Sequence, residues 1–133
     1  MVEQPITVGV VDDDPQLRNA LEQILTSKGF QTEQYASAEA FINAARTSKA
    51  DCLLVDIQLG DISGIELARE LRAIDCKFPI IFMTGSNDTI LYKQAMDCGC
   101  VAFLHKPFPA DQMVESIMKA TLPAGRQHEP CGR

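Results

Sequence analysis

Short apolar runs alternate along the chain with longer stretches of helical periodicity, five times over. The first run lacks strict alternation of apolar and polar positions, which indicates a strand covered on both faces, as in a parallel sheet. The second run is more polar and predicts an edge strand. The five predicted strands are residues 6–11, 31–35, 52–55, 79–83 and 101–104.

The stretches between these runs carry helix start and stop signals. Pro15 suits the first position of a helix that Asp14 caps, and Ser63 with Glu66 forms a capping box. Gly29 is placed to end the first helix. The predicted buried stripes are Leu17, Leu21, Ile24 and Leu25; Phe41, Ala44 and Ala45; Leu67, Leu71 and Ile74; Leu91, Ala95 and Cys98; and Val114, Ile117, Met118 and Thr121.

Five strand–helix units predict an α/β fold, a doubly wound five-stranded parallel sheet, because parallel neighbours need helical crossovers. The length of 133 residues suits one domain with one core. We place that domain at residues 1–122. Residues 123–133 are polar and rich in Pro and Gly, so we expect a flexible tail or the start of a linker there.

Charge and cysteine content narrow the function. The formal charge is −6, and the absence of a dense Lys/Arg cluster argues against direct nucleic-acid binding. No apolar run approaches the roughly 20 residues that span a bilayer, and the first residues lack a signal-peptide layout. We therefore expect a cytoplasmic protein without membrane contact. The five cysteines show no disulfide framework, and Cys98-Gly99-Cys100 lacks a second cluster for zinc, so reduced thiols are predicted.

Polar side chains follow four of the predicted strands. Asp12 and Asp13 follow the first, Asp56 the third, Thr84 the fourth and Lys106 the fifth. In parallel sheets ligands bind beyond the carboxyl ends of the strands. Three carboxylates gathered there repel one another and raise at least one pKa. A hard divalent cation relieves this repulsion, and oxygen-only ligands suit Mg²⁺.

Such a metal can bridge a carboxylate and a phosphoryl group, which reduces the repulsion between an anionic nucleophile and an anionic donor. Lys106 would add a second positive charge, and Thr84 a hydroxyl donor. Taken singly, each of these residues could be a turn residue, a helix cap or a solvated surface charge. Their convergence on one sheet edge indicates phosphoryl chemistry.

With these residues in place, the sequence resembles the receiver domains of bacterial two-component response regulators over about residues 6–122. The resemblance implies a flavodoxin-like (βα)5 fold with strand order 2-1-3-4-5. Residues 37–41 and 62–67 resemble most the nitrogen-fixation, FixJ-like branch. The segments that match the family are residues 10–14, 54–59, 82–85 and 103–108.

The resemblance implies that Asp56 accepts a phosphoryl group from a histidine kinase or a phosphotransfer protein. The chain would catalyse only its own phosphorylation and dephosphorylation, and would not otherwise be an enzyme. Mg²⁺ would be held by Asp13, Asp56 and the backbone carbonyl of Gln58, with Asp12 acting through water.

It also implies roles at the neighbouring strand ends. Thr84, the backbone of Gly85 and Lys106 would bind the phosphoryl oxygens. Thr84 and the aromatic Phe103 would form the switch, although Phe103 could equally be a permanently buried core residue. The Lys106–Pro107 peptide bond is expected to be cis.

The sequence departs from the family pattern at Gly60, where family members commonly carry Pro. Glycine relaxes the backbone, so the loop is expected to be more mobile while the chemistry stays intact. Gln58 and Ser86 can tune how readily water reaches the acyl phosphate, and the lifetime of the phosphorylated state is left open.

Three further questions remain open at this level. A haloacid-dehalogenase-type phosphatase would use Asp12 as its nucleophile, but it needs further acidic ligands after Lys106 and leaves Asp56 unexplained. A binding module that works without phosphorylation is a second alternative.

The form of the output is also open. The chain could be a stand-alone receiver or part of a longer regulator, acting through an output domain or a target protein. The resemblance places that output, or a homodimer, on the face of the fourth helix, fifth strand and fifth helix.

Overall fold

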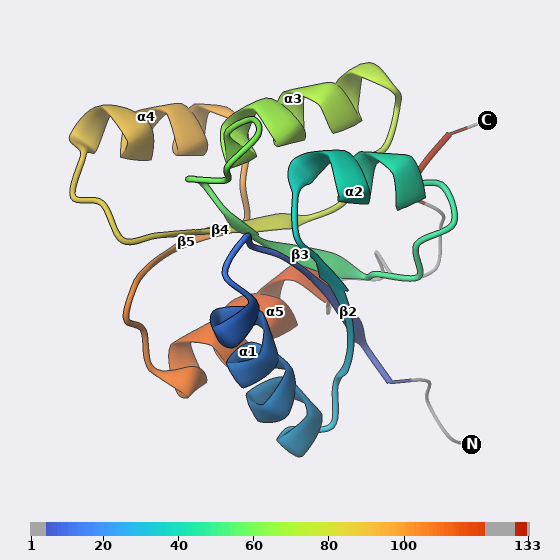
Figure 1. Ribbon diagram of the computed structural model, residues 1–133, viewed down its shortest axis with the longest axis vertical. Helices are drawn as coiled ribbons and strands as arrows, with labels where there is room; N and C mark the ends of the chain where they lie inside the picture. The colour runs from blue at the N-terminus through green and yellow to red at the C-terminus, as the bar shows by residue number, and fades with distance from the viewer. Residues whose placement is uncertain (1–4, 122–129, 133) are drawn as a thin grey trace.

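The computed structural model describes residues 5–121 and 130–132, and in these ranges it confirms the predicted α/β architecture (Figure 1). One parallel sheet has the strand order β2-β1-β3-β4-β5. No helix in the described part of the chain is long and apolar enough to cross a bilayer. The elements are β1 (Thr7–Val11), α1 (Pro15–Ser27), β2 (Gln31–Tyr35), α2 (Ala38–Ala44), β3 (Cys52–Asp56), α3 (Gly64–Ala73), β4 (Ile80–Thr84), α4 (Thr89–Asp97), β5 (Ala102–His105) and α5 (Ala110–Thr121).

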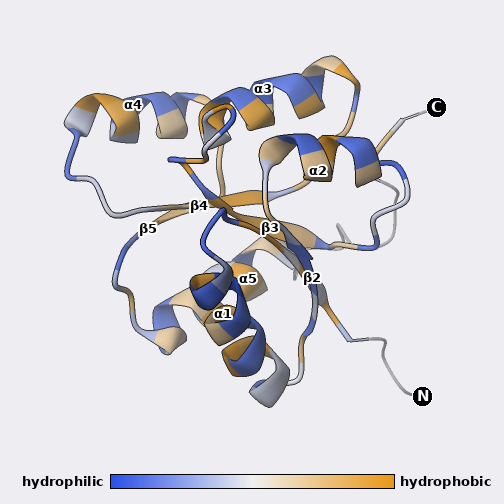
Figure 2. Ribbon diagram, in the orientation of Figure 1, coloured by the Kyte–Doolittle hydropathy of each residue, from blue (hydrophilic) through white to orange (hydrophobic). Residues whose placement is uncertain are grey.

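Helices cover both faces of the sheet, so the core has two halves. Helices α1 and α5 lie on one face, and α2, α3 and α4 lie on the other (Figure 1). Alternate residues of one strand supply opposite halves: Leu53 and Val55 pack with the α2–α4 side, and Leu54 packs with the α1 and α5 side. The central strands consist mostly of hydrophobic residues, shown in orange in Figure 2, as burial on both faces of the sheet requires.

The helix ends are those the sequence predicts. Asp14 accepts hydrogen bonds from two first-turn amides of α1, and Pro15 opens that helix. Ser63 and Glu66 form the reciprocal capping box of α3. Gly29 follows α1 with a φ of +93°, a conformation that glycine adopts without strain.

The predicted stripes include half-buried positions in α1, α2 and α4 (Leu17, Ile24, Ala44 and Leu91), and they differ most from the structure in α5 and α3. Helix α5 buries Met113 and Ser116, while Val114 and Met118 are only half-buried, because the face it turns to the sheet is rotated from the predicted stripe. The hydroxyl of Ser116 donates to the carbonyl of Gln112, which satisfies a polar group in this apolar setting. In α3, Ile74 is 37% exposed and stands at the C-cap rather than inside the helix.

The prediction of five reduced thiols is wrong for two of them. Cys76 and Cys131 form a disulfide, with an S–S distance of 2.07 Å, and the other three cysteines are free. Their separation of 55 residues gives no local signal, and only the fold brings them together. Of the expected flexible tail, residues 122–129 and 133 lie outside the described residues, whereas residues 130–132 are held against the domain by this bond and by backbone hydrogen bonds.

Candidate functional site

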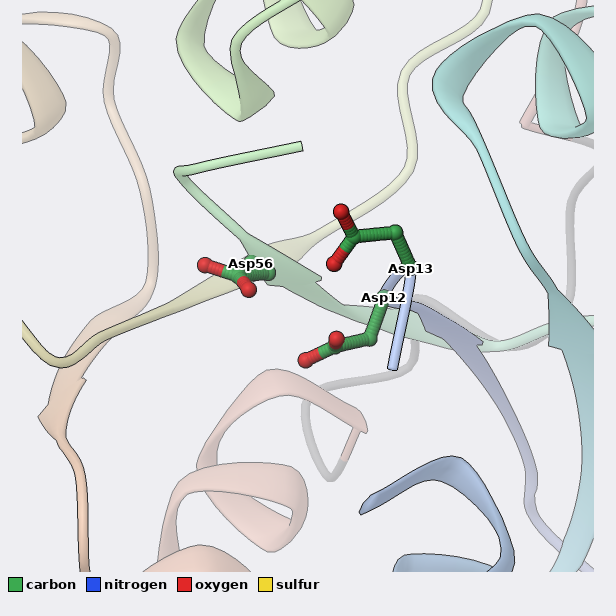
Figure 3. Close-up of side chains that lie close together, drawn as sticks. All are labelled: Asp12, Asp13 and Asp56. Carbon is green, nitrogen blue, oxygen red and sulfur yellow. The ribbon is translucent and has the colours of Figure 1, made fainter. Parts of the chain in front are cut away.

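The carboxyl edge of the sheet brings Asp12, Asp13 and Asp56 together where β1 and β3 end (Figure 3). Val11 and Val55 are register partners in the parallel pair, so the residues that follow them emerge side by side. One carboxylate oxygen from each of the three aspartates lies within 4.8 Å of the others.

The three carboxylates differ in burial and in their hydrogen bonds. Asp12 is 0% exposed and Asp56 is 6% exposed, whereas Asp13 is open to solvent. Oδ1 of Asp12 accepts the amide of Asp14 at 2.9 Å, and Oδ1 of Asp56 accepts the amide of Gln58 at 2.9 Å. Each buried carboxylate is therefore oriented by the backbone of the turn that follows its strand.

Lys106 joins the two buried carboxylates. Its Nζ lies 3.1 Å from Oδ2 of Asp12 and 3.1 Å from Oδ2 of Asp56. The lysine follows β5, and its amide donates to the carbonyl of Thr84 at 2.7 Å. The Lys106–Pro107 peptide bond is cis. The ammonium group thus stands between two negative charges that would otherwise repel each other.

The same geometry perturbs the ionisation of both partners. Burial raises the pKa of Asp56 and the charge of Asp12 adds to this, although the Gln58 amide and Lys106 oppose it. Burial acts to lower the pKa of Lys106, but the hydrogen bonds and charges of Asp12 and Asp56 outweigh it, so its pKa is raised. Lys106 is therefore held in its charged form beside a carboxyl group that resists ionisation.

Thr84 and Phe103 complete the edge on the β4 and β5 side. Thr84 is buried at the end of β4, and its hydroxyl oxygen accepts the amide of Ser86 at 3.0 Å, which leaves its proton free to donate elsewhere. Gly85 is exposed, and no atom stands within 4 Å of where its Cβ would be. Phe103 is half-buried and packs edge-on against Tyr92, with ring centroids 4.9 Å apart.

Gly64 is a positioning residue that the sequence reasoning missed. A Cβ at this position would lie 2.6 Å from the backbone carbonyl oxygen of Asp56, a separation that real Cβ atoms do not reach. The Gly64 amide also donates to the carbonyl of Ile57 at 2.8 Å. The start of α3 can therefore approach the end of β3 only without a side chain. The available signal was a glycine directly after the capping serine.

The loop between β3 and α3 is tied to a second helix. The carboxylate of Asp61 accepts the amides of Ala38 and Glu39 in the first turn of α2, at 3.3 and 3.0 Å. Burial acts to raise the pKa of Asp61, but these amide bonds outweigh it and lower its pKa. Gly60 precedes this anchor, and a Cβ there would meet only Asp13 Oδ2, at 3.5 Å. That is an ordinary contact, so the fold does not itself require glycine at position 60.

The donor set fits a hard divalent cation. All three groups that could ligate are carboxylate oxygens, and one of them, Asp13, is open to solvent. Oxygen-only sites of this kind suit Mg²⁺, which keeps part of its water shell.

Comparison with known proteins agrees with this geometry. The model of the response regulator receiver domain family matches residues 8–118. The transcriptional regulatory protein FixJ of Bradyrhizobium diazoefficiens is 37% identical over 120 residues, which cover 88% of this chain and 58% of that protein. The chain thus spans somewhat more than half the length of this relative.

Solved structures give the same result. The crystal structure of FixJ-N superposes with a TM-score of 0.84 at 36% identity, covering 91% of this chain and 97% of that one. Full-length FixJ from B. japonicum gives a TM-score of 0.84 at 32% identity, covering 94% of this chain and 61% of that one. These matches lend no support to the phosphatase alternative. The acidic edge, the sheet order and the family match lead to one conclusion: the chain belongs to the response regulator receiver domain family.

Proposed function

We propose that Asp56 accepts a phosphoryl group from a histidine kinase or a phosphotransfer protein, and that this switches the binding or activity of a downstream output. The observation that carries the proposal is the position of Lys106 Nζ, 3.1 Å from both Asp12 and Asp56. This cation can follow the negative charge as it spreads onto a phosphoryl group attached to Asp56.

Asp56 would act as the nucleophile. An oxygen of its carboxylate attacks phosphorus, the new P–O bond forms, and the P–N bond to the donor imidazole breaks, with the imidazole taking up a proton. The Gln58 amide and Lys106 favour the ionised form of Asp56, which the attack requires, against the effect of burial. Burial of Asp56 strengthens these electrostatic interactions by limiting competition from water.

Asp12, Asp13, Asp56 and the backbone carbonyl of Gln58 would hold Mg²⁺, with Asp12 acting through water. When bound, the ion supplies positive charge that lowers the repulsion between the carboxylate and the phosphoryl donor. The exposed Asp13 provides a ligand on the open side of the site.

Thr84, Gly85 and Lys106 would bind the phosphoryl oxygens. The Thr84 hydroxyl still has its proton to donate, and the space beside Gly85 lets an oxygen approach its backbone amide. Movement of Thr84 toward the phosphoryl group would free space for Phe103, which now packs on Tyr92. Thr84 and Phe103 would thus form the switch.

The output would be read on the face of α4, β5 and α5. Helix α4 exposes three large apolar side chains, of which Ile90 is 67% exposed; the others are Tyr92 and Met96. A homodimer, a target protein or an output domain of a longer regulator could cover them. We place the receiver at residues 1–122 and its site of action in the cytoplasm, with no direct contact to nucleic acid or membrane and no catalysis beyond its own phosphorylation and dephosphorylation.

The proposal is tested by incubating the protein with acetyl phosphate and Mg²⁺ and measuring the intact mass. We expect one phosphoryl adduct, which does not form when Mg²⁺ is chelated before the donor is added and is absent in Asp56→Asn. Asp97→Asn is the matched control, because Asp97 is an exposed aspartate at the end of α4, away from the site, and should label normally. Label that persists in Asp56→Asn and disappears in Asp12→Asn would support the phosphatase, and an unchanged mass in the intact protein would support a module independent of phosphorylation.

A further inference from the structure

The amino edge of the sheet, opposite the acidic site, holds the short segment 130–132. Its Cys131 is bonded to Cys76, which precedes β4. On either side of this bond the backbone pairs as an antiparallel bridge: the Lys77 amide donates to the carbonyl of Pro130 at 2.6 Å, and the Gly132 amide to the carbonyl of Asp75 at 2.7 Å. The segment is therefore docked by both covalent and backbone bonds.

Arg46, just after α2, fastens the segment from a second side. Its Nη1 donates to the carbonyl of Gly132 at 2.6 Å, and its Nη2 donates to the carbonyl of Ile74 at 2.7 Å. One guanidinium group thus spans segment 130–132 and the end of α3. The planar guanidinium group holds several donors in a fixed arrangement, so one arginine side chain can bond two separate carbonyls at once.

The backbone on both sides of the bridge is shaped to fit. Asp75 has a φ of +63°, in the left-handed region. A Cβ on Gly132 would overlap the carboxylate of Asp75, so a larger residue here would require that exposed side chain to move. The docked segment therefore makes contacts with Asp75 and Arg46 through Gly132, in addition to the bond between the two cysteines.

The two sulfur atoms differ in access. Cys76 is buried in the core, whereas Cys131 is half-buried and packs on the edge of that core. A reagent can thus reach the bond from the Cys131 side. Without the covalent bond, the three hydrogen bonds that involve the segment return little more than the conformational entropy lost by ordering it. The disulfide therefore decides whether residues 130–132 stay docked.

We propose that Cys76 and Cys131 form a reversible thiol–disulfide latch that docks segment 130–132 on the ends of α2 and α3 when oxidised and releases it when reduced. In reduction, a thiolate of a dithiol reductant attacks one sulfur of the disulfide and forms a mixed disulfide with it, which releases the other cysteine. The second thiol of the reductant then attacks its own sulfur in the mixed disulfide and releases the first cysteine. The reductant becomes a disulfide, and Cys76 and Cys131 gain two electrons and two protons. Oxidised glutathione reverses the step and leaves as two thiols.

This latch is a second input, separate from phosphorylation. It lies at the amino end of β4, while Thr84 of the acidic site lies at the carboxyl end of the same strand. Disulfides inside cells are mostly transient and redox-sensing, which is the behaviour a latch requires. Its state sets the position of residues 130–132 relative to α2 and α3.

The first test counts thiols and measures amide exchange on the full chain. After treatment with oxidised glutathione, a thiol reagent under denaturing conditions should label three cysteines, and after dithiothreitol all five. Reduction should speed exchange of the Lys77 and Gly132 amides by roughly tenfold or more. The Leu53 amide, which donates to Pro79 within the sheet, is the internal control and should not change.

Three variants separate the latch from general stability. Cys131→Ser should show fast exchange at Lys77 and Gly132 in both redox states, and the matched control Cys100→Ser should keep the redox response. Arg46→Gln should shift the equilibrium with glutathione toward the reduced form, roughly threefold to tenfold. The latch is refuted if oxidised glutathione leaves all five thiols reactive, or if Lys77 and Gly132 exchange equally in both redox states.

Discussion

The two edges of the sheet hold their side chains together in opposite ways. At the carboxyl edge, two buried carboxylates share one ammonium group, and burial raises the pKa of Asp56. At the amino edge, a disulfide joins Cys76 to Cys131, and the guanidinium group of Arg46 donates to a neutral backbone carbonyl. Burial opposes the charged form of Asp56 at the first edge, whereas a covalent bond joins the chain to itself at the second.

The difference shows what each edge is suited to do. A carboxylate that is costly to keep buried and ionised gains from any cation delivered to it, and a phosphoryl group attached to it would add negative charge that needs the same cations. A covalent bond that crosses 55 residues gains nothing from ligands but responds to the redox state. Stability and reactivity are therefore assigned to different ends of the same strands.

The largest expected effect is at the amino edge. In oxidising buffer, Cys131→Ser should lower the free energy of unfolding by about 2–4 kcal/mol, because the bond restricts the unfolded chain over a long loop. Urea unfolding measures this, with Cys100→Ser as a control that should change it far less. In reducing buffer the difference between Cys131→Ser and the unaltered protein should disappear; a difference that persists would assign the effect to packing and not to the bond.

A smaller effect is expected where the acidic edge is constrained by backbone. Gly64→Ala should cost about 1–3 kcal/mol, because the new methyl group must move α3 or the carbonyl of Asp56. It should also slow phosphoryl labelling at Asp56. Gly60→Ala is the matched control, since its Cβ would make only an ordinary contact, and it should leave both readings nearly unchanged. Equal effects of the two substitutions would remove the case for Gly64 as a positioning residue.

Neutralising Asp56 should sharpen the contrast between the edges by stabilising the protein. The pKa of Asp56 is raised above its ordinary value of 3.8, so the folded state binds the proton more tightly than the unfolded state does. The contribution of this group to stability is full below pH 3.8 and is lost as pH rises through the raised pKa. Asp56→Asn should therefore stabilise by about 1 kcal/mol at neutral pH, a gain that shrinks on acidification. Unfolding midpoints across this pH range would show a constant gain if charge burial were not the cause.

The smallest effect should have the opposite sign at the same edge. The pKa of Asp61 is lowered by the amides it accepts, so its contribution is present above its ordinary value and is lost as pH falls through the lowered pKa. Asp61→Asn should lower the unfolding midpoint slightly at neutral pH, and the gap should close in acid. If Asp61→Asn instead raised the unfolding midpoint as Asp56→Asn does, the hydrogen bonds of Asp61 to α2 would not stabilise the fold.

The sequence alone was sufficient to predict the strands and the polar residues at their carboxyl ends. Asp12, Asp56, Thr84 and Lys106 each stand at the end of an apolar run, and parallel strands put such ends at one edge. Gly64 could not be recognised in this way, because its requirement is a distance to the carbonyl of Asp56 and not a local preference. The roles assigned to these residues in phosphoryl transfer stay predictions until the labelling is done.

Two features depended on tertiary packing that no local pattern carries. The pairing of Cys76 with Cys131 needs the chain to return to the start of β4 after α5, which residue spacing does not encode. The buried face of α5 includes Met113 and Ser116 because the helix is rotated against the sheet, while the apolar period alone is equally compatible with Val114 and Met118.

The contact between Lys106 and Asp12 also has a consequence for synthesis. These residues lie 94 positions apart, and Lys106 lies 50 positions from Asp56. Because translation proceeds from the N-terminus, the aspartates leave the ribosome long before the only cation that bridges them in the described structure. A nascent chain therefore holds its acidic residues without their lysine until the fifth strand has emerged. If Asp56 accepts the phosphoryl group as proposed, the site is complete only after Lys106 has been synthesised, and a chain that ends before this residue would not compete for the phosphoryl donor.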